Sequence, residues 1–261
     1  MSENLPISIN TANKEQLIEE IKNLHKQVIQ LEKTKNTEPY QLAQQKALFA
    51  VISKIRESLD LDSIFKSTAI EVRQLLNADR VGMYKFDTDS KYEWGEFVSE
   101  DVLPDFRPAL SAEIKDHCFG EHYINYYLHG KIWASDDIYG SKLPRCYVQV
   151  LSQFQIRANL VAPLLKGEEL WGLLCIHQCS GPREWKESEM EFVRQIATHL
   201  GIALQHAEFV KQLQMQSEYL TQAVNQAVER EKAVAAIINK IRQSLQLNTF
   251  LPQQPKKFVN F

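Results

Sequence analysis

The chain has 261 residues, a formal net charge of -3 and 24% charged residues, which is ordinary for a folded soluble protein of one or two domains. This charge balance gives no electrostatic reason to expect nucleic acid as a partner. No apolar run approaches the roughly 20 residues that cross a bilayer, and the polar N-terminus does not resemble a signal peptide, so we expect a cytoplasmic protein without a membrane segment.

Helical patterns open the chain. Residues 14–33 repeat apolar side chains at alternating spacings of four and three, which predicts a coiled-coil seam that connects domains or joins two copies. The seam positions are Leu17, Ile21, Leu24, Val28 and Leu31. Residues 36–39 predict a break, because they end in a proline. A second helix is expected to follow and to end near Leu59, and a third is predicted over residues 63–76.

Two β-hairpins follow in the predicted order of elements. The first joins residues 81–86 to 92–98, and the second joins residues 159–165 to 170–177 across a Lys-Gly-Glu-Glu turn. In each hairpin, apolar and β-branched residues flank a short polar turn. We therefore predict antiparallel strands in both places.

Residues 99–157, between the hairpins, are irregular and rich in aromatic residues, histidine and cysteine. A short strand is predicted at 132–138 and a short helix at 147–154. A loop region of this length inside a compact domain usually has a function. After the second hairpin, residues 187–245 predict one long helix, whose first half packs on the sheet or on a partner helix.

An internal repeat relates residues 51–61 to residues 237–247, with seven of eleven positions identical at an offset of 186 residues. This offset is a plausible module length. We expect the second copy to be the truncated start of a second module.

Four cysteines lie at positions 118, 146, 175 and 179. In a reducing compartment they are not expected to form disulfides. Cys175 lies among residues typical of a sheet core and Cys179 at a strand end, so both are predicted to be inert. Cys118 and Cys146 lie in the irregular region, where the neighbouring His117 and Arg145 could stabilise a thiolate. The sequence therefore points to Cys118 and Cys146 as the candidates for thiol chemistry.

Zinc coordination is an alternative role for four of these side chains, namely Cys118, Cys146, His117 and His122. Structural zinc sites usually pair their ligands at short spacing, and this chain has no second short-spaced pair. We predict no metal site.

Several motifs together resemble one family. They are Asp116-His-Cys-Phe119, the strand Gln155–Pro163, the block Leu170–Trp185, and Cys146 at 28 residues after Cys118. Over residues 45–210 the chain resembles a GAF domain, and specifically the cyanobacteriochromes, the bilin-binding photoreceptors of the phytochrome superfamily, in their Asp-X-Cys-Phe subfamily.

The resemblance implies an α+β fold, a GAF domain with an antiparallel sheet flanked by helices, plus coiled-coil-like helices at both ends. The expected domains are a helical connector at 1–40, a chromophore-binding GAF domain at 41–212, and a signalling helix with the truncated second module at 213–261.

The resemblance also implies a covalent linear tetrapyrrole, phycocyanobilin or phycoviolobilin. Cys146 would form the thioether to ring A, and Cys118 would add reversibly to the bridge between the middle rings. The remaining chromophore-binding residues implied are Asp116 at the pyrrole nitrogens, His117, Phe119 as pocket packing, Tyr147, and His177 near ring D. The family commonly has histidine where this chain has Tyr147, which can stack and donate a hydrogen bond but carries protons poorly at neutral pH.

The expected function is therefore a photoreceptor module of blue/green type, without enzymatic activity beyond attaching its own bilin. We expect a homodimer formed through the helices and a downstream signalling domain that is missing from this chain. Two alternatives remain: a GAF module that binds a non-covalent ligand such as a cyclic nucleotide, and a dimerisation scaffold.

Overall fold

A computed structural model describes residues 11–110, 112–115 and 123–249 of the chain. It contains two compact units, residues 1–207 and residues 208–261. Within the described residues, the first unit contains one antiparallel sheet of six strands in the order β3-β2-β1-β6-β5-β4. The strands are β1 Arg80–Phe86, β2 Trp94–Val102, β3 Glu113–Lys115, β4 Trp133–Ser135, β5 Ala158–Lys166 and β6 Glu169–Gln178.

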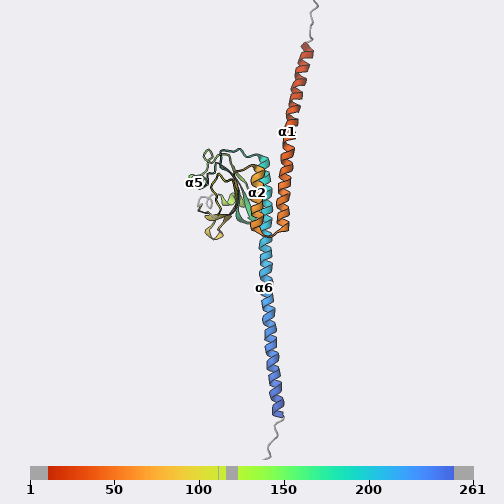
Figure 1. The fold of residues 1–261 in the computed structure, drawn as a ribbon, viewed down its shortest axis with the longest axis vertical. Helices are drawn as coiled ribbons and strands as arrows, with labels where there is room; N and C mark the ends of the chain where they lie inside the picture. Colours follow the sequence, from red (N-terminus) through yellow and green to blue (C-terminus); the bar gives the residue numbers. More distant parts are fainter. Residues whose placement is uncertain (1–10, 111, 116–122, 250–261) are drawn as a thin grey trace, which may run out of the picture. The chain divides into compact units, whose positions relative to one another are not determined.

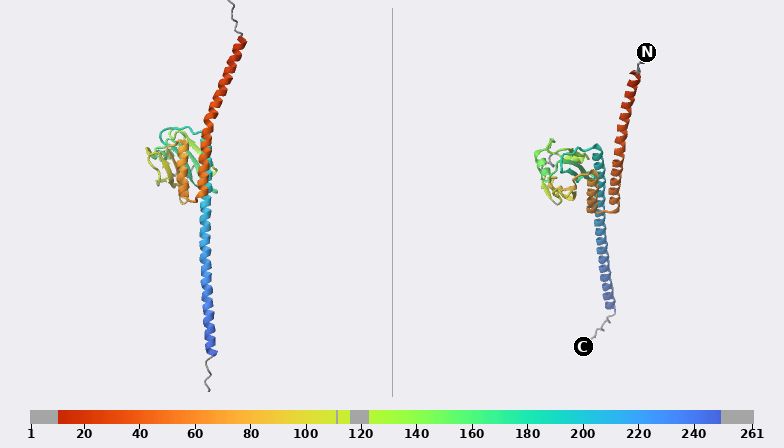
Figure 2. Two further views of the ribbon diagram at one scale, coloured as in Figure 1. Left: turned by 45° about the vertical axis from the view of Figure 1, so that its right-hand side comes forward. Right: turned by 45° about the horizontal axis from the view of Figure 1, so that its top comes forward.

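Within the first unit, long helices lie on one side of this sheet, and a short helix lies on the other (Figures 1 and 2). The long helices are α1 Thr11–Glu57, α2 Leu61–Leu76 and α6 Glu187–Thr249, and the shorter ones are η1 Thr88–Ser90, α4 Ile124–Leu128 and α5 Arg145–Gln153. In the second unit, the side chains of α6 from residue 211 to residue 245 are exposed. None of the helices in the described ranges is long and apolar enough to cross a membrane.

The two faces of β5 and β6 belong to two separate apolar clusters. Leu160 and Leu164 of β5 and Ile176 of β6 pack with α2 and the first part of α6. Their neighbours Val161 and Cys175 face the opposite way and pack with α4 and α5. Because both faces of these strands are covered, the strands are apolar almost throughout, and the polar residues in them stand out.

Most of the predicted elements are present. Both hairpins, β1 with β2 and β5 with β6, pair antiparallel as predicted. The long helix α6 begins at the predicted residue, and Val193, Ile196 and Leu200 in its first half are fully buried in the core. The GAF fold with an antiparallel sheet and flanking helices is therefore confirmed, whereas coiled-coil pairing stays a prediction.

The predicted break at residues 36–39 is wrong, because α1 continues through Pro39. The proline ring fixes φ close to the helical value, so a helix can continue through it at the cost of one backbone hydrogen bond. The region between the hairpins is also more regular than predicted: β2 continues to Val102, and β3 and α4 occur within it. Elements of three to five residues are too short to show a period.

The contact of α6 with β5 leaves no room for a side chain at Gly201, since a Cβ there would lie 2.5 Å from the carbonyl oxygen of Leu165. We expect Gly201→Ala to lower the free energy of unfolding by about 1–3 kcal/mol through overpacking, although alanine normally favours a helix. Urea unfolding measures the change, and Ile202→Ala, at an exposed position on the same turn, serves as the control. A more stable Gly201→Ala variant would contradict this close packing.

Candidate functional site

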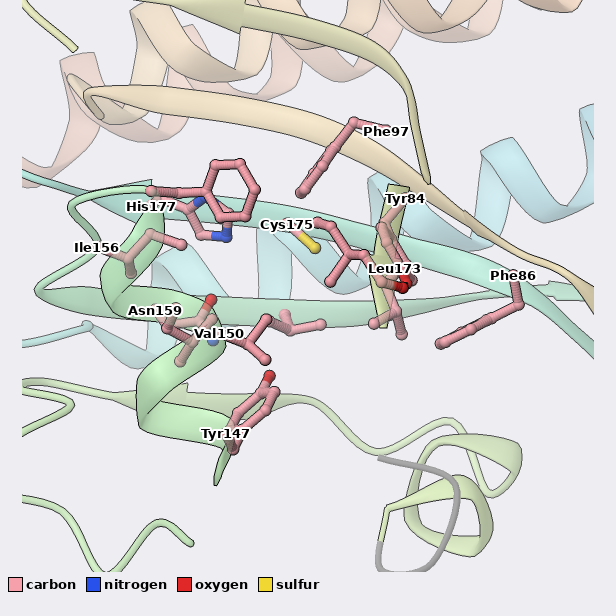
Figure 3. Close-up of a pocket in the computed structure, with 14 residues that line it drawn as sticks. Tyr84, Phe86, Phe97, Tyr147, Val150, Ile156, Asn159, Leu173, Cys175 and His177 are labelled. Carbon is pink, nitrogen blue, oxygen red and sulfur yellow. The ribbon is translucent and has the colours of Figure 1, made fainter. Parts of the chain in front are cut away.

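A cavity lies between the sheet and α5 on the side of the sheet away from the long helices (Figure 3). Its walls come from β1, β2, β3, β5, β6 and α5, and they are mostly aromatic and aliphatic. The largest side chains are Tyr84, Phe86, Phe97, Tyr147, Phe154 and Leu173. Apart from the tyrosine hydroxyls, the polar lining among the described residues consists of Asn159, Cys175 and His177, and none of these lining side chains is an acid, a lysine or an arginine.

The cavity has a volume of about 60 Å³. Pockets that hold drug-sized ligands usually measure ~300–1,000 Å³. A large ligand would therefore have to separate α5 from the sheet or displace lining side chains.

Helix α5 carries Cys146, which directly precedes a residue that lines this cavity. The helix begins at Arg145, so Cys146 lies in its first turn, where unsatisfied backbone N–H groups stabilise a thiolate. Cys146 is half-buried, and the next residue, Tyr147, is buried and lines the cavity. The sequence predicted a helix starting at Tyr147, two residues after the observed start, and so left Cys146 outside it.

Cys146 is disulfide-bonded in the structure, so the expectation that none of the cysteines forms a disulfide is wrong. A disulfide requires two Cα atoms within about 7 Å, and sequence spacing alone does not reveal such a distance. Any reaction of the Cys146 thiol therefore requires prior reduction.

His177 lies on β6 with 2% of its surface exposed, and its side chain lines the cavity. Burial lowers the pKa of His177 well below its ordinary value, and the nearby positive charge of Arg80 lowers this pKa further. The imidazole is therefore neutral at physiological pH. Its Nδ1 has no hydrogen-bond partner within the described part of the chain.

Beside His177, Arg80 and Glu100 form a buried ion pair. Arg80 Nε lies 2.8 Å from Glu100 Oε1, and the two side chains are 0% and 3% exposed. Arg80 also donates from Nη1 to the carbonyl of Phe154 at 3.1 Å and from Nη2 to the carbonyl of Arg107. Glu100 accepts from the backbone N–H of Ala109 at 2.9 Å. The pair thus ties β1 and β2 to the end of α5 and to the loop after β2.

Cys175 and Cys179 are more deeply buried than Cys146. Burial raises the pKa of Cys175 to about 12 and that of Cys179 to about 11. The positive charge of Arg80 lowers both pKa values, but by less than burial raises them. Both thiols are free and buried. Cys175 lines the cavity, yet its thiol is almost entirely protonated at neutral pH and is a poor nucleophile.

The other predicted site residues, Asp116, His117, Cys118 and Phe119, lie outside the described residues, as does His122 of the rival zinc set. The structure thus brings together Tyr147 and His177 at one cavity, and Cys146 directly precedes Tyr147 on α5. Sequence reasoning missed Asn159, Arg80 and Glu100. A lone amide in the apolar strand Ala158–Leu165 was a signal that could have found Asn159.

Comparison with known proteins identifies the family. The GAF domain model matches residues 60–204, more than half of the chain, and the chain belongs to this family. A putative methyl-accepting chemotaxis protein of Synechocystis sp. is 38% identical over 160 residues, which is 61% of this chain. This chain spans only 16% of that relative.

Solved structures place the chain among the cyanobacteriochrome and phytochrome GAF domains. The blue-light absorbing form of the PixJ GAF domain from Thermosynechococcus elongatus matches with a TM-score of 0.57 and 34% identity, covering 61% of this chain and 94% of that one. The phycocyanobilin-bound GAF domain of a cyanobacterial phytochrome matches with a TM-score of 0.58 and 26% identity, covering 64% and 96%. The resemblance stated from the sequence motifs is confirmed.

Removing one partner of the buried ion pair leaves the other charge without compensation. We expect Glu100→Ala to lower the free energy of unfolding by about 3–5 kcal/mol. The matched control is Glu169→Ala, which removes a more exposed pair with Lys166 and should cost under about 1 kcal/mol. Equal losses in urea unfolding would contradict the role assigned to Arg80 and Glu100.

The thiol pKa values predict selective alkylation of the reduced protein. At pH 8, fewer than about one in a thousand Cys179 side chains, and fewer still of Cys175, are thiolates. Iodoacetamide should therefore modify Cys146 in the folded protein well before Cys175 and Cys179, and their reactivity should rise about tenfold per pH unit up to the pKa. Peptide mass spectrometry measures the rates, with urea-unfolded protein as the control. Equal rates at Cys175 and Cys146 would contradict the prediction.

Proposed function

We propose that this chain is a photosensory GAF module that binds a linear tetrapyrrole covalently through Cys146. The observation that carries the proposal is the position of Cys146 in the first turn of α5, directly before a residue that lines an apolar cavity. The bilin-bound relative supports the ligand class, since its structure holds phycocyanobilin in a GAF domain of the same fold.

The attachment reaction needs no oxidant or reductant once Cys146 is a thiol. Its sulfur adds to the ethylidene side chain of ring A, an S–C bond forms, and the thiol proton is transferred to the ring carbon. The disulfide at Cys146 must first be reduced by a dithiol. The bound bilin is phycocyanobilin, or phycoviolobilin if the ring system isomerises after attachment.

The bilin supplies the photochemistry, and the residues of this chain hold and orient it. Light isomerises the bridge before ring D, and this ring moves against His177. Cys118 adds to or leaves the middle bridge, which interrupts or restores conjugation and gives a blue/green pair of states. Its proton moves to a ring nitrogen on addition and returns to the sulfur on release. The module catalyses no other reaction.

The signalling output lies outside this module in our proposal. The chain spans a small part of its chemotaxis relative. We propose a homodimer joined through the helices and a downstream signalling domain, with a population shift carried along α6.

The cavity lining disfavours the cyclic-nucleotide alternative. A cyclic phosphate needs a cation or several N–H donors. The described lining residues contribute no lysine or arginine, and the one histidine is held neutral. An extended conjugated ligand suits aromatic and aliphatic walls better.

Co-expression of the chain with a phycocyanobilin pathway under reducing conditions should give a coloured protein that fluoresces with zinc in a denaturing gel. Cys146→Ala should lose this band, because no other described thiol is nucleophilic at neutral pH. Cys118→Ala should keep the band and lose the blue-shifted state.

Cys175→Ala is the matched control, since it removes a thiol that lines the cavity itself. It should keep both the band and the photoconversion. A wild-type protein without a fluorescent band would refute the proposal, and a band that persists in Cys146→Ala would move the attachment to another residue.

A further inference from the structure

An apolar stripe runs along one face of α6 in the second unit of the chain. Its large side chains follow heptad spacing, and each of them is exposed. The stripe consists of Leu213, Leu220, Val224, Val234, Ile238, Ile241 and Leu245. Ala227 occupies one further position of the same pattern. The pattern extends beyond the ~3–4 heptads that indicate a coiled coil, in which a second helix covers such a stripe.

One charged residue interrupts the stripe. Glu231 lies four residues after Ala227 and three residues before Val234, so it belongs to the same face of the helix. The residues three and four positions away from Glu231 are Ala227, Val228, Val234 and Ala235. Residues at these spacings are the ones that a helical side chain can contact. The helix therefore offers Glu231 no cation of its own.

Arg230 lies at the border of the stripe and is in the same situation. The residues three and four positions away from it are also uncharged. Adjacent residues of a helix do not face each other, so Arg230 and Glu231 of one helix are not a pair. The ion pair that the structure describes in this turn joins two other residues, since Lys232 Nζ lies 2.9 Å from Glu229 Oε1. Arg230 and Glu231 are both exposed, and a second helix on the stripe would meet both charges.

We infer that two copies of the chain pair along this stripe as a parallel coiled coil in register, and that Arg230 and Glu231 set the register. The inference rests on the homodimer of the proposed function and does not depend on the bilin. Glu231 occupies the heptad position a, and Arg230 occupies the position g before it. In a parallel pair, a side chain at a inserts between the g, a and two d residues of the facing helix. Glu231 of each copy therefore lies beside Arg230 of the other.

The charges of this layer identify its partner as a second copy in one register. The layer contains two carboxylates and two guanidinium groups, so it has no net charge. A shift by one heptad would place Glu231 against Val224 or Ile238, next to Ala223 or Ile237 at the g position. A charge covered in this way without a partner is costly. A polar residue at a single a position specifies register in the same manner.

Charge reversals test the layer, with the dissociation constant of the dimer measured by sedimentation equilibrium of the full chain at low ionic strength. Glu231→Arg makes all four charges of the layer positive, and Arg230→Glu makes all four negative. Each variant should raise the dissociation constant about tenfold or more, because like charges then face each other. The double variant Arg230→Glu/Glu231→Arg exchanges the charges within the layer and should restore a dissociation constant close to that of the wild type.

Glu229→Arg is the matched control, because it makes the same change of charge two residues earlier, at a position outside the stripe. It should leave the dissociation constant nearly unchanged. Equal effects of Glu229→Arg and Glu231→Arg, or a double variant that dimerises no more tightly than the single ones, would overturn the inference and leave the homodimer intact. A wild-type chain that stays monomeric would overturn the homodimer, and the inference with it, whereas bilin attachment would still be tested by the zinc-fluorescent band.

Ser217→Cys tests the direction of the two helices. Ser217 is an exposed a position within the stripe, and a disulfide requires two Cα atoms within about 7 Å. A parallel pair in register should therefore give a disulfide-linked dimer on a non-reducing gel after mild oxidation. The wild type and Glu218→Cys, whose new thiol lies outside the stripe, should not give this dimer. A Ser217→Cys protein that sediments as a dimer but forms no such link would overturn the parallel arrangement.

Discussion

The cavity side of the sheet depends on the buried guanidinium of Arg80. A buried charge is tolerated only when it is paired and hydrogen-bonded, and Arg80 meets this condition through Glu100 and the carbonyls of Phe154 and Arg107. These partners come from β2, from the end of α5 and from the loop after β2. One side chain thus fixes the geometry of three segments around the cavity, including the helix that carries Cys146.

Burial, and to a smaller extent the charge of Arg80, sets the protonation of the neighbouring His177 and Cys175. Burial and Arg80 both lower the pKa of His177, so the imidazole stays neutral and can donate or accept a hydrogen bond. At Cys175 the two effects oppose each other, and burial prevails. Cys146 lies instead in the first turn of α5, near N–H groups that favour a thiolate. The fold thereby places Cys146, half-buried, at the start of a helix and Cys175, fully buried, in the apolar core.

The sequence predicted those parts of the fold that depend on local patterns. Alternating apolar residues and polar turns predicted both hairpins. Apolar residues spaced three and four positions apart predicted the first half of α6. It failed at Pro39, because a helix can continue through a proline, and where elements are too short, as in β3 and α4. The motifs indicated His177 and Cys146. The position of Arg80 beside His177, however, depends on the pairing of β1 with β6, which are separated by more than 80 residues in the chain. No local sequence pattern shows which residues of β1 and β6 pair with one another.

Successive side chains of β5 and β6 alternate between the face that lines the cavity and the face that packs against α6. Asn159 and His177 face the cavity, whereas their chain neighbours Leu160 and Ile176 pack in the cluster that contains Ile196 of α6. Because interiors are close-packed, a strand that shifts on one face must also move the side chains on its other face. At Gly201, α6 packs directly against the backbone of β5 at Leu165, so the two elements cannot move closer together there. A shift of β5 or β6 at the cavity is therefore transmitted through the sheet to the first part of α6.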